Sequence, residues 1–177
     1  MGRHCGYLAL MGGMATGAER VYMHEEGVTL ADLQKDLNNL IAGFEHNKRL
    51  GLIIRSESAD LFYTTPFIAS LFEKEGGDLF DVRQAILGHV QQGGAPSPFD
   101  RIQATRMAAR CIEFLSREAG KVSPAGAFIG LQMGQYTFTS LGDFPRMVDA
   151  EFSRPKEQWW LKLRPIASMM SEPNPTD

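Results

Sequence analysis

Polar residues suited to binding a phosphorylated ligand lie in three short stretches of the chain. MGRHCG places Arg3 among glycines, LIIRSES carries Glu57 after apolar residues, and DVRQAILGHVQQGG carries Arg83 and His89. A guanidinium holds a phosphate through paired hydrogen bonds, and a histidine donates a hydrogen bond to the same group. A carboxylate accepts hydrogen bonds from hydroxyls. Together these residue types favour a phosphorylated sugar as the ligand.

Each stretch also has a plainer interpretation that the residues alone leave open. Arg3 fits a solvated arginine on a glycine turn, Glu57 an exposed charge at a strand end, and His89 a loop histidine with satisfied hydrogen bonds. The glycines around Arg3 could equally lead into a helix whose first N–H groups, unpaired by nature, meet an anion. No GxxxxGK[ST] phosphate loop stands in the sequence.

The elements that must position these residues alternate between strands and helices. Thr29 and Asp32 before regularly spaced leucines predict a capped helix, Pro66 opens a second, and Ser97 with Asp100 opens a long amphipathic third. The expected strands lie at 21–23, 49–58, 81–94 and 126–138, and the expected helices at 29–46, 64–77, 97–120 and 154–170. This order is typical of an α/β fold with a mainly parallel sheet, which gathers ligands at the carboxyl ends of its strands.

Composition narrows the class of protein. A length of 177 residues favours a single domain, and a net charge of −3 argues against a nucleic-acid or anionic-membrane surface. No run of 18 apolar residues occurs, and the glycine-rich opening does not fit a signal peptide. Cys5 and Cys111 stand far apart without a CxxC partner, which predicts small buried residues in a reducing compartment.

Three stretches resemble the ATP-dependent 6-phosphofructokinases, in particular the C-terminal, regulatory-type half of the tandem eukaryotic enzyme. They are MGRHCGYLAL, AILGHVQQGGAPSPFDR and RPKEQWWLKLRP. The resemblance implies an incomplete Rossmann-like three-layer α/β fold of the phosphofructokinase type, with the chain as the C-terminal part of one such domain. It further implies an α/β core with the sugar-phosphate site at residues 1–135, and a closing segment and tail at 136–177.

The resemblance also assigns the site. The residues that it places around the fructose phosphate are Met1, Gly2, Arg3, Glu57, Arg83, His89, Gln92 and Arg154. Gln92 stands where catalytic halves have arginine and is similar to the regulatory halves, whereas the MGR form of Arg3 is similar to the catalytic site. The ligand is therefore either fructose 6-phosphate, the substrate, or fructose 2,6-bisphosphate, the activator.

The family's ATP loop and catalytic aspartate precede its MGR motif, so the resemblance implies a fragment that holds neither and is inactive alone. ATP and Mg²⁺ are expected for the complete enzyme, bound by no residue of this chain. The expected partners are the missing N-terminal portion and further subunits of a cytoplasmic tetramer. A non-catalytic activator-binding module and an inert truncated fragment are the alternatives. Glu19 and the HNKR stretch resemble part of a nucleotide effector site, or a solvated helix end.

Overall fold

The computed structural model describes residues 2–169. The helices are α1 (Tyr7–Thr16), α2 (Leu30–Glu45), α3 (Thr65–Gly76), α4 (Pro98–Glu118), α5 (Phe144–Met147) and α6 (Arg164–Met169). The strands are β1 (Arg20–Tyr22), β2 (Ile53–Arg55), β3 (Ala127–Gln132), β4 (Gln135–Ser140), β5 (Val148–Asp149) and β6 (Arg154–Pro155). Short 3-10 helices cover Gly77–Leu79, Gly88–Gln92, Leu141–Asp143 and Trp159–Leu163. Among these residues, β1 pairs with β2 in parallel, and β3 with β4 and β5 with β6 pair antiparallel.

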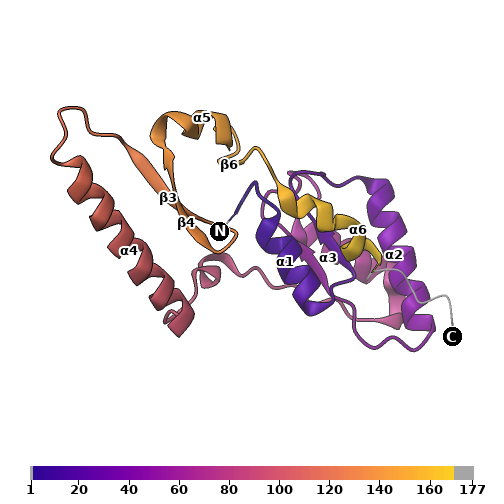
Figure 1. Cartoon of the computed structure of the whole chain (residues 1–177). Helices are drawn as coiled ribbons and strands as arrows, with labels where there is room; N and C mark the ends of the chain where they lie inside the picture. Colours follow the sequence, from indigo (N-terminus) through magenta and orange to yellow (C-terminus); the bar gives the residue numbers. More distant parts are fainter. Residues whose placement is uncertain (1, 170–177) are drawn as a thin grey trace.

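Three layers meet at the parallel pair β1–β2. Successive side chains of a strand point to opposite faces, so Tyr22 enters one apolar cluster while Val21 and Met23 enter another. The Tyr22 cluster is built mainly by α2 and α3, and the second cluster by α1 and the closing segment with Trp160. Figure 1 shows these helices gathered around the two strands. The fold class expected from the sequence is confirmed, with the parallel sheet limited to this one pair among the described residues.

Local sequence signals account for where the helices begin. Thr29 and Asp32 form the expected capping box of α2, because each side chain accepts the backbone N–H of the other residue. Ser97 and Asp100 do the same for α4, and Thr64 caps α3 ahead of Pro66. These contacts fix α2, which supplies Leu33 and Leu37 to the core, and the start of α4.

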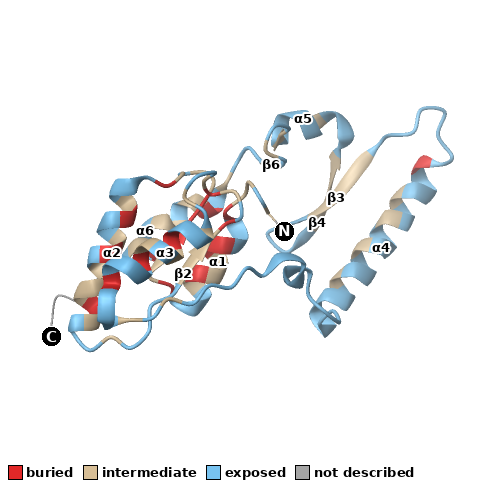
Figure 2. Cartoon of the chain, turned by 180° about the vertical axis from the view of Figure 1, so that it is seen from behind, coloured by how far each residue is buried: buried red, intermediate tan, exposed pale blue. Residues whose placement is uncertain are grey.

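A second group of elements extends away from the first. We call the group of α1, α2, α3, α6, β1 and β2 the body, and residues 98–147 the arm. In the arm, Phe114 of α4 stacks on Phe138 of β4 with ring centroids 4.7 Å apart, and Tyr136 donates to Gln103 (2.6 Å). Figure 2 shows buried residues concentrated in the body and an arm that is largely exposed. Large apolar side chains are therefore uncovered along α4, including Phe99, at 69% exposure.

Two expected strands differ in the structure. The stretch 81–94 is not a strand but an exposed connection with one 3-10 helix at Gly88–Gln92, because no neighbouring strand pairs with it among the described residues. The stretch 126–138 is not one strand but most of the hairpin β3–β4, which turns at Met133 and Gly134. Both turn residues have positive φ (49° and 78°), as a two-residue hairpin turn of the I′ type requires.

The C-terminal helix and the two cysteines differ in part from what the sequence predicts. The helix expected at 154–170 forms only in part: Arg154–Pro155 is strand β6, and helical structure begins with the 3-10 turn at Trp159–Leu163 and continues as α6. Cys5 and Cys111 are free thiols that are partly exposed rather than buried. Within residues 2–169, no helix combines the length and the apolar character that crossing a membrane requires.

Candidate functional site

The carboxyl ends of β1 and β2 lie at the same edge of the body, because the two strands are parallel. His24 and Glu25 follow β1, and Glu57 follows β2. The glycine-rich turn at residues 2–6 runs along this edge, held by Ser58 N–H and Ser56 Oγ, which donate to the Arg3 carbonyl (3.2 and 3.3 Å). The sheet therefore brings two of the predicted stretches together.

Arg3 and Glu57 face one another at this edge. The Nε of Arg3 lies 3.3 Å from Oε1 of Glu57, and the two side chains are 62% and 56% exposed. A surface ion pair of this kind contributes only about 0–1 kcal/mol to stability, so a ligand separates it at small cost. The pair places one exposed guanidinium and one exposed carboxylate side by side.

Arg55, which the sequence reasoning did not single out, holds the loop that carries Glu57. Its guanidinium donates to the carbonyls of Tyr63 (3.1 Å), Ser56 (3.3 Å), Glu57 (2.9 Å) and Asp60 (2.5 Å). Burial lowers the pKa of Arg55 from its ordinary value, and the nearby Asp60 raises it. Because a single cation binds four carbonyls, the backbone on which Glu57 stands is fixed relative to β2. The signal available in the sequence was an arginine at the end of an apolar strand.

A second ionic cluster lies beneath the turn at residues 2–6. Arg154 Nη1 donates to the His4 carbonyl (2.8 Å) and lies 3.0 Å from His24 Nδ1 and 3.7 Å from Glu25 Oε1. Its guanidinium also sits 4.8 Å from the centroid of the Phe152 ring. Only 14% of the Arg154 side chain and 5% of the Glu25 side chain are exposed. Arg154, a predicted site residue, therefore lies beneath this turn with its donors directed toward the chain itself.

The environment of His24 lowers its pKa and so disfavours the protonated form. Burial lowers the pKa of His24, the charges of Arg154 and His4 lower it further, and Glu25 raises it. Nδ1 can accept a hydrogen bond from Arg154 only when that nitrogen carries no proton. The lowered pKa and the 3.0 Å contact are therefore consistent with one another.

The third predicted stretch is not part of this edge. Arg83 is 82% exposed and pairs with the neighbouring Asp81 (3.6 Å), and His89 and Gln92 are exposed in the 3-10 helix. Among the described residues, no hydrogen bond or ion pair joins these three side chains to Arg3 or Glu57. The predicted site residue Met1 lies outside the described residues, and Gly2 is partly buried in the turn.

Glu19 and the HNKR stretch are also in contact. Lys48 Nζ lies 2.8 Å from Glu19 Oε1, and the Glu19 carboxylate accepts the Leu52 N–H. The Glu19 side chain is 15% exposed, so its charge is balanced within the body. This pair ties the end of α2 to the start of β1.

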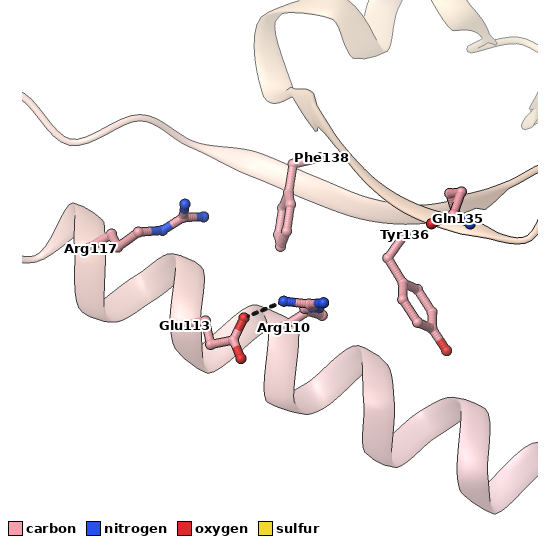
Figure 3. A pocket seen from close by; sticks show the side chains of 6 residues that line it. All are labelled: Arg110, Glu113, Arg117, Gln135, Tyr136 and Phe138. Carbon is pink, nitrogen blue, oxygen red and sulfur yellow. Dashed lines mark hydrogen bonds and ion pairs between the residues drawn. The ribbon is translucent and has the colours of Figure 1, made fainter.

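The arm carries a separate cleft. Figure 3 shows the side chains that line it between α4 and β4, namely Arg110, Glu113, Arg117, Gln135, Tyr136 and Phe138. The volume of the cleft is about 480 Å³. Arg110 pairs with Glu113 across one helical turn (2.8 Å). Within residues 2–169, no group of three or more His, Cys, Asp or Glu side chains could hold a metal ion.

Comparison with known proteins gives one consistent answer. The family described as Phosphofructokinase matches residues 1–115. The human muscle-type ATP-dependent 6-phosphofructokinase is 38% identical over 182 residues, covering 97% of this chain and 23% of the relative. The Dictyostelium discoideum ATP-dependent 6-phosphofructokinase is 46% identical over 166 residues, covering 92% of this chain and 20% of the relative.

Solved structures agree with the sequence relatives. The phosphofructokinase of Saccharomyces cerevisiae superposes with a TM-score of 0.90 at 32% identity, covering 96% of this chain and 24% of that one. The T-state phosphofructokinase of Pichia pastoris gives a TM-score of 0.82 at 32% identity, covering 94% and 21%. The chain thus spans about a quarter of the length of these relatives or less. With its sequence and its fold both matched, the chain belongs to the phosphofructokinase family.

Proposed function

We propose that this chain forms the sugar-phosphate-binding part of an ATP-dependent 6-phosphofructokinase. The observation that carries the proposal is the exposed Arg3–Glu57 pair at the carboxyl edge of the parallel strands (3.3 Å). A cation and a carboxylate side by side match a ligand that has a phosphate and hydroxyls, and that edge is where α/β sheets bind ligands. The family supports the reaction class, which is transfer of a phosphoryl group from ATP to fructose 6-phosphate.

In this proposal, Arg3 meets the phosphate and Glu57 accepts sugar hydroxyls. Arg83 and His89 complete the phosphate contacts when the exposed 81–94 connection approaches Arg3, and their exposure leaves both side chains available. Arg154 lies beneath the same turn and adds positive charge to the site. Met1 and Gly2 would supply backbone to the sugar.

A second candidate function is a non-catalytic module that binds fructose 2,6-bisphosphate. Gln92 favours it, because the QQGG form is similar to regulatory halves of the family. Gln92 is exposed on the same 3-10 helix as His89, so both candidates use the same donors and differ in the ligand. Binding of such an activator would shift the assembled enzyme between two states.

The exposed arm supports a further part of the proposal. The apolar side chains uncovered on α4 include Ile102, Ile112 and Leu115, each more than half exposed. Exposed apolar surface on this scale marks an interaction site. We propose that the rest of a phosphofructokinase subunit covers it and supplies the ATP and Mg²⁺ sites in a cytoplasmic tetramer. This chain alone would then transfer no phosphoryl group.

Calorimetric titration of the purified chain with each sugar phosphate tests the proposal. We expect binding of at least one of them, and expect Arg3→Ala, Arg83→Ala and His89→Ala to weaken it. Arg110→Ala is the matched control, because Arg110 and Glu113 form an equally exposed ion pair on the arm (58% each). Preference for fructose 2,6-bisphosphate would favour the activator module over the substrate site. Binding of neither sugar would contradict both, as would a loss of binding in Arg110→Ala equal to that in Arg3→Ala.

A further inference from the structure

We propose that Glu25 is a positioning residue for the Arg3–Glu57 site, acting through the backbone of the turn at residues 2–6. This inference deepens the proposed function and rests on it. Glu25 was not among the residues that the sequence pointed to. It touches neither Arg3 nor Glu57, and its carboxylate lies where three segments of the chain meet.

The first contact of Glu25 is with the start of α1. The buried Gly6 N–H donates to both carboxylate oxygens, at 2.9 and 3.0 Å. Gly6 is the N-cap of α1, and this helix has neither a side-chain cap nor an acidic residue in its first turn. Glu25 thus supplies from 19 residues away the negative charge that a helix N-terminus favours.

The contact between Glu25 and the Gly6 N–H affects how an anionic ligand can bind at this edge. The sequence left open an anion bound by the N–H groups at the start of α1, but the Gly6 N–H already has a carboxylate as its partner. A sugar phosphate at this edge is then expected to meet the exposed Arg3 side chain of the turn rather than the Gly6 N–H. The buried Glu25 carboxylate fixes the turn, and the exposed Arg3 guanidinium receives the ligand.

The second contact of Glu25 is with the returning C-terminal segment. Arg154 Nη1 lies 3.7 Å from Glu25 Oε1 and donates to the His4 carbonyl, which belongs to the same turn. The Gln158 amide, oriented so that its nitrogen donates to Glu25 Oε1 (2.9 Å), accepts from Arg154 Nε (3.2 Å). The buried charge of Glu25 is therefore paired and hydrogen-bonded, as a buried charge must be.

These contacts hold the turn at Arg3 itself and at the residues that follow it. Ser56 and Ser58 bind the Arg3 carbonyl from β2, while Glu25 and Arg154 bind the next part of the turn from β1 and β6. The direction of the Arg3 side chain toward Glu57 depends on this backbone being fixed. Removing Glu25 releases the Gly6 end and leaves Arg154 free to rearrange.

A double-mutant cycle in ligand binding tests the inference. Glu25→Ala is expected to weaken binding of the preferred fructose phosphate by about tenfold in the wild-type chain, as loss of a hydrogen bond to a charged group does. In an Arg3→Ala background the same change is expected to have less than about a twofold effect, because Glu25 acts through Arg3. Glu26→Gln is the matched control, because the neighbouring Glu26 pairs with Arg164 of α6 instead (2.6 Å). Equal factors in both backgrounds would overturn the inference.

A measurement without ligand separates this inference from the proposed function. In ¹H–¹⁵N spectra of the free chain, Glu25→Ala is expected to shift the Gly6 amide and the Arg3 Nε–H signals, and Glu26→Gln to shift neither. If the wild-type chain binds no fructose phosphate, the proposed function fails while these signals still decide the role of Glu25. An Arg3 Nε–H signal that stays in place in Glu25→Ala would show that Glu25 does not position Arg3. General unfolding is recognised because it would collapse signals throughout the body.

Discussion

Adjacent glycines of α1 are expected to respond differently to the same substitution. A Cβ at Gly12 would meet only Ile54 Cδ1, at an ordinary 3.9 Å, whereas a Cβ at Gly13 would overlap Cγ2 of Val21. Val21 is buried in β1 and, being β-branched, has a stiff side chain that does not swing away. Gly13 therefore allows α1 to approach β1 closely, which places the turn at residues 2–6 along the edge of the strands.

Two effects determine the expected change in the free energy of unfolding. Replacing glycine by alanine inside a helix contributes about 1 kcal/mol to stability, and this gain applies at both positions. Overpacking a filled core costs about 1–3 kcal/mol, and this cost applies only at Gly13. We expect Gly12→Ala to raise the free energy of unfolding by up to about 1 kcal/mol. Gly13→Ala is expected to fall below Gly12→Ala by about 1–3 kcal/mol.

Thermal and urea unfolding of both variants, followed by circular dichroism, measures this difference. For a chain of this size 1 kcal/mol corresponds to about 2–4 °C in Tm. Gly12→Ala is therefore expected to melt slightly above the wild-type chain and Gly13→Ala below Gly12→Ala. If both variants gain stability equally, the close approach of α1 to β1 is wrong.

Three further outcomes are expected. Tyr22→Phe removes the hydrogen bond from Tyr22 to Asp36 (2.8 Å) and should lower the free energy of unfolding by about 1 kcal/mol in urea titrations; an unchanged midpoint would contradict this bond. Because the pKa of His24 is lowered from 6.5, the unfolded chain takes up this proton first, so stability falls as the pH drops through about 6.5 and is full above it. Urea unfolding at several pH values should show that fall reduced in His24→Gln, and an identical profile would refute it. Ser97→Ala removes the cap of α4 and should cost about 1 kcal/mol locally, seen as faster amide exchange in the first turn; unchanged exchange there would count against it.

Local signals in the sequence were enough to place the main helices. The boxes at Thr29 and Ser97 are satisfied within four residues of chain, so a short stretch contains all the information that is needed. The stretch 81–94, which the sequence predicted to be a strand, shows where local signals are not enough. Its apolar residues resemble a strand, but a strand forms only against a partner, and the partner is a property of the whole fold.

The residues of the candidate site also fall into those that local sequence pointed to and those that it did not. Arg3 and Glu57 were recognisable from their residue types, among glycines and after an apolar stretch, and the parallel strands bring the two side chains together. Glu25 and Arg55 were missed because their roles depend on backbone groups that adopt their positions only after folding. An acidic residue just after a strand, together with a helix lacking its own cap, was the available signal for Glu25.

The central claim is that a fructose phosphate binds at the Arg3–Glu57 edge of the body. Amide and arginine side-chain signals of the ¹⁵N-labelled chain, followed during titration with fructose 6-phosphate and with fructose 2,6-bisphosphate, test it most directly. We expect saturable shifts at Arg3, Glu57 and the 83–92 segment, with Arg110 and Arg117 of the arm cleft unchanged. Shifts confined to the arm cleft, or no saturable shift with either sugar, would contradict the account.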